Sequence, residues 1–251
     1  MATAAIFAPK NHLLRRLSPA DLARVRPLLK RVQLPFSHVI SEAGDAVEGI
    51  IFIEEGIASL IVVLNNGASI EIALVGAEGV VGIPALFDAK KSPYRVIVQG
   101  GGYGYRLGNG ALKRVLESDG SLTKLLMQSA YRISLETAQT AACNRLHEAE
   151  ERLARWLLLM DDRNPTSVLP MTHEFLSAML GTRRSTVTIA SGMLQRAGLI
   201  EHRRGHIRVV DRPGLENAAC ECYALMRNGH STMPHAASPR TNGLRNNAKT
   251  A

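Results

Sequence analysis

Residues 171–200 constrain the fold more than any other stretch, because they have the pattern of two short helices joined at a glycine. Thr172 can cap the first helix, and Gly181 can take the positive φ that a tight turn often needs. Apolar residues recur at helical spacing on one face of the first helix: Phe175, Leu176, Met179 and Leu180. The second helix is predicted to have Thr182 as its N-cap, to end at Gly198 and to bury one stripe: Val187, Ala190, Ser191 and Leu194.

The outward face of the second helix is polar and cationic. Its members are Arg183, Arg184, Ser185, Thr188 and Ile189. A guanidinium can bridge guanine O6 and N7 in the major groove, and an aliphatic side chain can contact a thymine methyl. The face therefore indicates a DNA-reading helix and implies no catalytic chemistry. The alternative is a solvated basic surface on a helical hairpin.

Residues 199–210 have the pattern of two short strands around a turn at 203–205, which predicts a wing beside the helices. Between His173 and Arg212 the chain has seven arginines and three acidic residues, an electrostatic footprint suited to DNA. We expect base contacts from Arg184 and Ile189, and adaptable or phosphate contacts from Ser185 and Thr188. Phosphate positioning is expected from Thr172, Arg183, Arg203 and Arg204, and Thr182 is expected to belong to the same DNA-binding set.

Composition and charge limit the classes of protein to which this chain can belong. The 251 residues carry a net charge of +8 and are 46% hydrophobic, enough for substantial cores and favourable for polyanionic partners. Nothing resembles a signal peptide or a membrane span, so a cytoplasmic protein is expected. The three cysteines are too few for a disulfide framework. Cys220-Glu-Cys222 could bind metal or sense oxidation, but its spacing is not a zinc pattern, and we expect no metal site.

The first part of the chain predicts an α+β arrangement. Ser18-Pro19-Ala20-Asp21 has the pattern of a helix start, and Pro27 should perturb that helix. From Val32 to Leu107, short β-branched runs alternate with glycine turns, as in an antiparallel, jelly-roll-like β-roll. The run Gly100-Gly101-Gly102 is expected to mark a strand end.

Residues 122–142 contain no glycine or proline and predict a long helix. Its apolar side is interpreted as a dimer seam formed with a second chain; the alternative is that the helix lies on its own β-domain. The expected seam residues are Leu122, Leu125, Leu126, Ser129 and Ile133. A further helix, 147–160, should pack under the DNA-reading unit, and residues 228–251 predict a disordered tail.

This order of elements resembles the bacterial Crp/Fnr transcription regulators. The match is close at Leu169–Thr188 and Gly198-Leu199-Ile200, and looser at Gly44-Asp45, Ile51–Gly56 and Gly79–Gly82. The resemblance implies four parts: a sensor β-roll (1–120), a dimerisation helix (121–145), a winged helix-turn-helix (146–215) and a C-terminal segment (216–251). It also implies a homodimer on a near-palindromic operator of double-stranded DNA, with RNA polymerase as a further partner.

Departures from the family pattern concern the signal. Cyclic-nucleotide members carry Gly-Glu-Leu followed by Arg-Ser, whereas this chain has Gly82-Ile83-Pro84 and then Ser92-Pro93-Tyr94-Arg95. We therefore expect no cyclic nucleotide, and Arg95 is a weak candidate for an anion contact. The iron–sulfur members need four cysteines, so that cluster is excluded. No cofactor is expected, and the protein could bind DNA without an effector.

Two other functions compete with that of a regulator. A cupin-like metal enzyme would need clustered histidines, but the roll offers only His38 with Glu42. An effector- or partner-binding module without specific DNA reading also remains open. Specific, salt-sensitive DNA binding would exclude that module. The sequence predicts a regulator and not an enzyme, but it does not name the signal, the operator or the sense of regulation.

Overall fold

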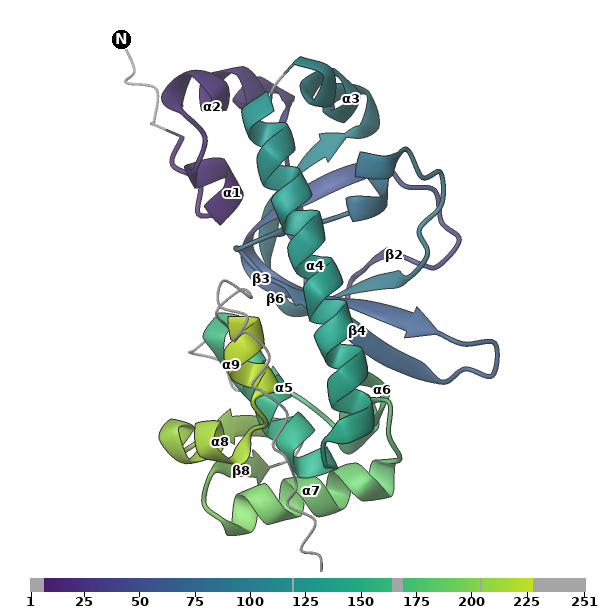
Figure 1. Cartoon of the computed structure of the whole chain (residues 1–251), viewed down its shortest axis with the longest axis vertical. Helices are drawn as coiled ribbons and strands as arrows, with labels where there is room; N and C mark the ends of the chain where they lie inside the picture. The colour runs from purple at the N-terminus through teal and green to yellow at the C-terminus, as the bar shows by residue number, and fades with distance from the viewer. Residues whose placement is uncertain (1–6, 119, 164–168, 204, 228–251) are drawn as a thin grey trace, which may run out of the picture.

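The computed structural model describes residues 7–118, 120–163, 169–203 and 205–227. The predicted tail and Arg204 lie outside the described residues. A β-domain and a smaller, mainly helical unit are connected by one long helix that runs past both of them (Figure 1). Helix α1 (His12–Arg15) and helix α2 (Pro19–Val25) precede the sheet. Ser18 caps α2 by accepting a hydrogen bond from Asp21 N at 3.1 Å, and Pro27 lies in the 3-10 turn that follows.

The β-domain is an antiparallel roll. Its strands are β1 (Lys30–Leu34), β2 (Val39–Ser41), β3 (Gly49–Val63), β4 (Ser69–Val75), β5 (Val80–Val81) and β6 (Arg95–Gly108). The strand order is β1-β6-β3-β4, with β2 also paired to β6 and β5 to β3. A 3-10 turn, η2 (Ile83–Phe87), connects β5 toward β6. The predicted roll is confirmed in type and position.

Glycines bend the two longest strands instead of ending them. Gly56 has φ +102° and lies inside β3, so the β-branched runs before and after this glycine belong to one strand. The run Gly100–Gly102 likewise lies inside β6, which corrects its assignment as a strand end. A Cβ on Gly102 would lie 2.0 Å from the Glu55 carbonyl oxygen. Glycine is therefore required because β3 and β6 approach closely at this bend.

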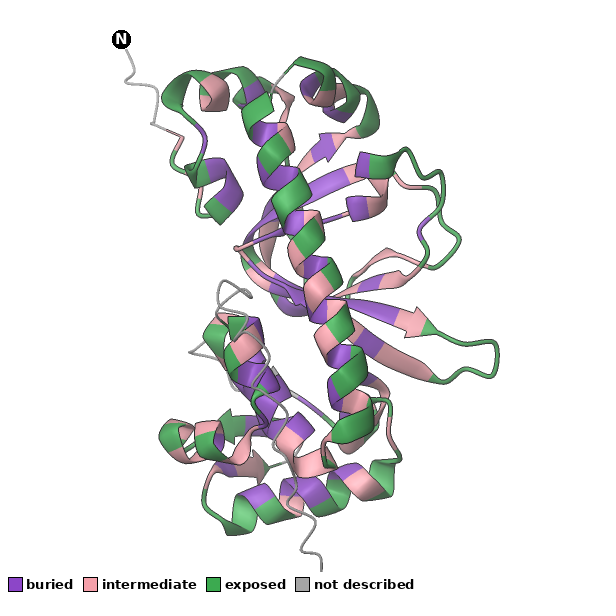
Figure 2. Cartoon of the chain, viewed as in Figure 1, coloured by how far each residue is buried: buried purple, intermediate pink, exposed green. Residues whose placement is uncertain are grey.

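After α3 (Asn109–Ser118), helix α4 (Gly120–Leu146) crosses the roll and reaches the smaller unit (Figure 1). Its apolar stripe, assigned from the sequence to a dimer seam, faces its own chain (Figure 2). The five expected seam residues are at most 7% exposed: Leu122, Leu125, Leu126, Ser129 and Ile133. Four of them belong to the core of the roll. The seam assignment is therefore wrong for these residues, because side chains already buried have almost no surface left for a partner.

The smaller unit contains α5 (Ala149–Arg163), β7 (Leu169–Pro170), α6 (His173–Leu180), α7 (Arg184–Arg196), β8 (Ile200–Arg203), β9 (His206–Val209), α8 (Arg212–Ala218) and α9 (Cys222–Arg227). As expected, α5 packs under α7. Ile57, Ile61 and Leu74 of the roll join this second core, so the two parts share buried apolar surface. Among the described residues, no helix is both long and apolar enough to cross a bilayer.

Candidate DNA-binding face and sensor cavity

Helix α6 and the turn after it form as the sequence predicts. Thr172 caps α6, since its hydroxyl accepts a hydrogen bond from Phe175 N at 3.1 Å. Leu176, Met179 and Leu180 are buried, while Phe175 is half-buried against the Trp156 ring. Gly181 ends the helix with φ +57°, a conformation that favours glycine. The turn therefore fixes α7 at an angle to α6.

Helix α7 buries the predicted stripe but begins one residue later than expected. Val187, Ala190, Ser191 and Leu194 are all buried. The N-cap residue is Arg183, with no side-chain cap hydrogen bond, which corrects the assignment of Thr182 as the cap. The backbone explains the shift, because Thr182 N still bonds to Ser177 O at 3.0 Å and belongs to the turn.

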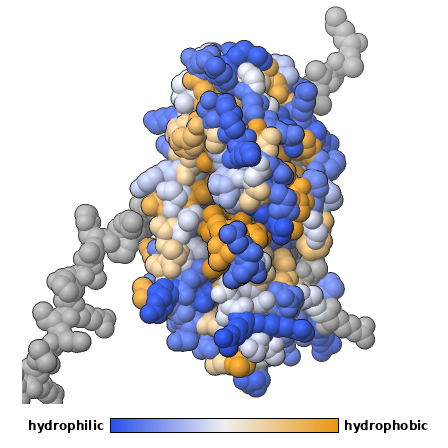
Figure 3. Space-filling view, turned by 90° about the vertical axis from the view of Figure 1, so that its right-hand side faces the viewer, coloured by the Kyte–Doolittle hydropathy of each residue, from blue (hydrophilic) through white to orange (hydrophobic). Residues whose placement is uncertain are grey.

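The outer face of α7 is exposed along its first two turns, at the lower end of the molecule (Figure 1). It presents the predicted set: Arg183, Arg184, Ser185, Thr188 and Ile189. Ile189 is 64% exposed, a high value for an aliphatic side chain. Within the described chain, neither Arg183 nor Arg184 forms an ion pair, so both guanidinium groups are available to a partner. In space-filling form, hydrophilic side chains cover most of this end (Figure 3).

The wing is a small antiparallel sheet. Strand β9 pairs with β8 on one side and β7 on the other. Glu201 Oε1 lies 2.8 Å from Arg203 Nε, and Glu201 Oε2 lies 2.7 Å from Arg208 Nη2. The Glu201 carboxylate thus forms ion pairs with two arginines of the wing. Exposed pairs of this kind contribute little to stability.

The Arg212 side chain is not available to contact DNA. Its guanidinium is held by Asp161, Asp162 and Glu216, and it donates to Tyr223 Oη at 2.7 Å. These contacts join α8 to α5 and α9. The charge count from the sequence therefore overstated the arginines available to DNA, since spacing alone cannot reveal an ion pair between distant segments.

Two histidines behind α7 were missed by the sequence analysis. His173 Nε2 and His202 Nδ1 are 3.0 Å apart, and His173 Nδ1 lies 3.0 Å from the Thr188 hydroxyl. Burial is the main cause that lowers the pKa of both histidines, with Arg184 adding to the effect on His173. The pair thus connects α6, the wing and the exposed helix. Its residues come from separate elements, so no local pattern signals it.

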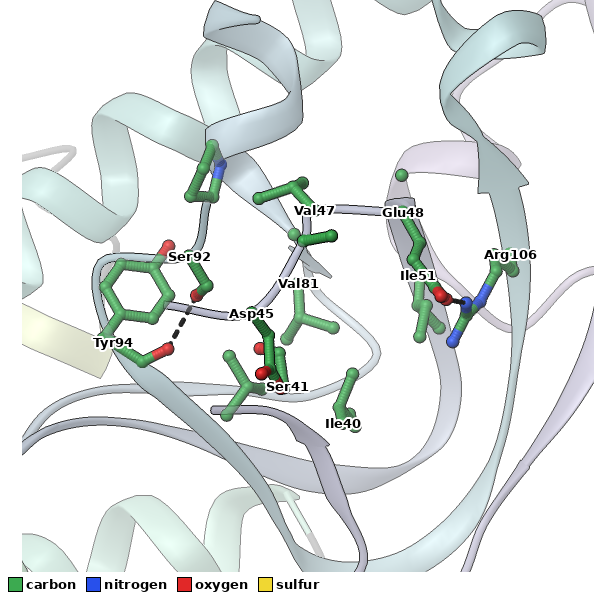
Figure 4. Close-up of a pocket in the computed structure, with 15 residues that line it drawn as sticks. Ile40, Ser41, Asp45, Val47, Glu48, Ile51, Val81, Ser92, Tyr94 and Arg106 are labelled. Carbon is green, nitrogen blue, oxygen red and sulfur yellow. Dashed lines mark hydrogen bonds and ion pairs between the residues drawn. The ribbon is translucent and has the colours of Figure 1, made fainter. Parts of the chain in front are cut away.

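The roll contains a cavity of about 250 Å³ near the start of β3 (Figure 4). Its polar lining includes Ser41, Asp45, Glu48, Ser92 and Arg106. The Arg106 guanidinium is paired with the Glu48 carboxylate. Arg95, the candidate from the sequence, does not line this cavity. The residue that does, Arg106, lies on the same strand eleven positions further along.

Buried polar contacts connect the roll to the helical unit. Trp156 Nε1 of α5 donates to Glu71 Oε1 of β4 at 2.8 Å, and the Ser59 hydroxyl lies 2.5 Å from the other oxygen. Burial raises the pKa of Glu71 to about 7, against the hydrogen bonds, which act to lower it. A second contact joins Glu78 to Arg132 of α4 and Arg163 of α5. A displacement within the roll would therefore act directly on both helices.

Comparison with known proteins matches both parts of this architecture. Residues 31–119 match a cyclic nucleotide-binding domain, and residues 151–218 match a Crp-like helix-turn-helix domain. The chain belongs to the Crp/Fnr family of transcription regulators. Its members regulate transcription and are not enzymes, which excludes the cupin-like alternative. In agreement, His38 is exposed, and Glu42 pairs with Arg95 at 2.7 Å.

Solved structures of other Crp/Fnr proteins share the fold. A crp/fnr-family regulator from Eubacterium rectale superposes with a TM-score of 0.67 at 16% identity, covering 82% of this chain and 97% of that chain. A family member from Thermus thermophilus gives 0.65 at 25% identity, with 76% and 98% covered. FixK2 from Bradyrhizobium japonicum gives 0.65 at 18% identity, also with 76% and 98% covered. No curated protein matches the sequence.

The segment that differs from the cyclic-nucleotide members of the family lies at the start of η2. Gly82 has φ +88° and precedes η2, where Pro84 stands in the first turn. The segment that carries a ribose-binding glutamate in the cyclic-nucleotide members is here Gly82-Ile83-Pro84-Ala85, with no acidic residue. Glu48 and Asp45 lie in the adjacent cavity instead. The domain therefore keeps the family fold with a different set of polar side chains.

Proposed function

We propose that the protein is a sequence-specific, DNA-binding homodimer that reads a near-palindromic operator. The observation that carries the proposal is the outer face of α7, where Arg184 and Ile189 are exposed over a fully buried stripe. Arg184 would read a guanine and Ile189 a thymine methyl, while Arg183, Arg203 and Thr172 position the backbone. Thr188 shares its hydroxyl with His173 and with Arg184 O, which leaves it an adaptable role.

The dimer would use the other side of α4. Exposed positions recur there at helical spacing and include small residues that permit close approach: Lys124, Met127, Tyr131, Ser134, Ala138, Ala141 and Arg145. Tyr131 is 65% exposed. Phe87 of η2 is also exposed and lines the same hollow as Met127 and Tyr131. Pairing along this face would bury apolar surface that a single chain leaves in water.

A charged substitution on the exposed face of α4 tests the proposed dimer interface. Tyr131→Glu places two carboxylates close together in the proposed interface, and we expect a dimer-to-monomer shift in sedimentation velocity. Lys113→Glu, on the exposed side of α3, is the control and should leave the mass unchanged. A Tyr131→Glu protein that stays fully dimeric at micromolar concentration would exclude this face of α4.

The roll would act as the sensor, and its ligand would not be a cyclic nucleotide. If the roll binds no ligand, the protein would bind DNA without an effector. The acidic groups Asp45 and Glu48 disfavour a cyclic phosphate in the cavity, because like charges repel. A ligand that moved β4 would act on α5 through Glu71 and Trp156, and so bias the spacing of the two α7 helices. As a regulator in the bacterial cytoplasm, the dimer would act on RNA polymerase from its operator.

The first experiment is selection of bound sequences from a random duplex pool with purified, ligand-free protein. We expect enrichment of a palindrome whose half-sites lie about one helical turn apart, roughly 10 base pairs. That result would also establish that DNA binding needs no effector. If specific binding appears only after a cell extract fraction is added, a signal is required. Retention without any enrichment under both conditions would support the effector- or partner-binding module.

A further inference from the structure

Three buried cysteines and a histidine meet where α4 ends. Cys143 lies in the last turn of α4, and His147 follows one helical turn later. Cys220 lies in the connection between α8 and α9, and Cys222 is the first residue of α9. One ligand atom from each of the four residues lies within 4.8 Å of every other. Two segments more than seventy residues apart in sequence thus contribute two ligands each.

The distances between these atoms suit one tetrahedral ion. Ligands bound to the same zinc lie about 3.8 Å apart for two sulfurs and about 3.6 Å for sulfur and nitrogen, given usual bond lengths. Cys143 Sγ and Cys220 Sγ are 3.5 Å apart, and Cys222 Sγ lies 3.6 Å from His147 Nδ1. A disulfide would need its sulfurs at about 2.0 Å. The cluster is therefore spaced for coordination.

The surroundings orient the ligands as metal sites do. His147 Nε2 lies 3.2 Å from the Glu221 carboxylate, leaving Nδ1 directed at the sulfurs. Metal-binding histidines almost always donate their other ring N–H to such a group, which fixes the tautomer. Gln139 Nε2 donates to Cys222 Sγ at 3.0 Å, a contact that favours a sulfur carrying negative charge.

Two buried arginines near the cluster add an electrostatic argument for a site with negative charge. Arg152 and Arg155 are 8% and 4% exposed, and both guanidinium groups interact electrostatically with Cys143. Within the described residues neither arginine forms an ion pair, and each has an Nε without a hydrogen-bond partner. Buried cations require nearby negative charge. Glu71 also interacts electrostatically with Arg155. Three thiolates and a histidine around a divalent ion would add one net negative charge beside both arginines.

We propose that Cys143, Cys220, Cys222 and His147 Nδ1 bind one zinc ion in a closed tetrahedral site. Each thiol that ionises on binding releases one proton to solvent. The short Cys220-Cys222 spacing does not predict this site, because the other two ligands come from α4 and the residue just after it. All four residues lie outside the segments matched to the two family domains. The site is thus an addition to the shared architecture.

The ion would fasten α9 to the end of α4. That junction joins the helix that crosses the sensor to the unit that carries α7, so zinc would set the angle between them. This consequence for DNA binding rests on the proposed function, but the metal site does not. Metal content and DNA affinity are separate measurements, and either can fail alone.

The test is metal analysis of untagged protein purified under reducing conditions. We expect one zinc per chain by mass spectrometry, and less than a tenth of that in Cys222→Ser and His147→Ala. His38→Gln, an exposed histidine of the roll, is the matched control and should keep its zinc. Wild-type protein stripped with chelator and loaded with Co(II) should show the visible bands of a tetrahedral thiolate site.

The cobalt experiment keeps the proposal falsifiable if the variants fail to fold, because it uses the natural sequence. Protein without zinc that also takes up no cobalt would overturn the proposal. Iron in place of zinc, with a visible chromophore, would overturn the assignment of the ion. A Cys143–Cys220 disulfide in the reduced preparation, detected by peptide mass, would overturn it as well.

Discussion

The start of α7 and the roll use their arginines in opposite ways. On α7, Arg183 and Arg184 are exposed and form no ion pair with another described residue. In the roll and at its contact with α4 and α5, the corresponding cations are committed to carboxylates: Arg95 to Glu42, Arg106 to Glu48, and Arg132 and Arg163 to Glu78. The helical unit therefore has free charge for a polyanion. An anionic ligand in the cavity beside Arg106 would first have to displace the Glu48 carboxylate.

The largest effect is expected from removing the shared carboxylate between the parts. Glu78→Ala leaves Arg132 and Arg163 without their carboxylate in a mostly buried position, which should cost about 3 kcal/mol of unfolding free energy. The measurement is urea denaturation at pH 7. Glu55→Ala removes an exposed ion pair with Lys10 and should cost much less, because solvent screens that pair. Equal costs for the two variants would remove the distinction between structural and surface pairs.

Low pH should weaken the ion pairs that Glu78 forms with Arg132 and Arg163. The two arginines hold the pKa of Glu78 at about 2, below its ordinary 4.5, in spite of burial. A carboxylate with a lowered pKa contributes stability above its unfolded pKa, and that contribution is lost as pH falls from about 4.5 toward 2. The loss should be absent from Glu78→Ala.

Glu71 should have the opposite pH dependence. Its pKa in the folded chain is about 7, above its ordinary 4.5. Stability is therefore full below about pH 4.5 and is lost as pH rises through 7, by about 3 kcal/mol at pH 8. Glu71→Gln keeps an acceptor for Trp156 and should be more stable than wild type at pH 8 and similar at pH 5. Exposed Glu117→Gln is the control, and an unchanged pH profile in Glu71→Gln would contradict the assignment.

Arg184→Ala tests the free charge on α7. We expect a loss of about 1–3 kcal/mol in binding to the selected operator and a relaxed preference at one base pair. Competition binding with operators changed at single positions measures both quantities. If the variant bound every sequence more weakly by the same factor, Arg184 would contact phosphate and not a base.

The smallest effect is expected at the wing. Arg203→Ala removes one phosphate contact, but Arg203 already shares Glu201 with Arg208. Binding should weaken by less than about 1 kcal/mol for all sequences alike, and the slope of affinity against salt should fall by about one. A change in sequence preference would place Arg203 at a base edge. It would then be a specificity residue, and the contrast with Arg184 would disappear.

The features that local sequence fixes were predictable. The cap at Thr172, the positive φ of Gly181 and the stripe from Val187 to Leu194 follow from spacing along single helices, because a periodic apolar pattern allows only one face to be buried. The roll was predictable as a type of structure from its alternating β-branched runs. Its glycine bends were not, since Gly102 is required by a close approach to Glu55, nearly fifty residues away.

Tertiary structure decided which partner each side chain meets. The stripe of α4 was visible in the sequence, but whether a second chain or its own roll covers it depends on packing, and Leu122 and Leu126 face the roll. Spacing showed Arg212 as a cation, and the fold placed it among three carboxylates. Cys143 and Cys220 become neighbours only when α9 packs on α4. Periodicity determines which face is buried, whereas contacts between distant segments exist only once the chain has folded.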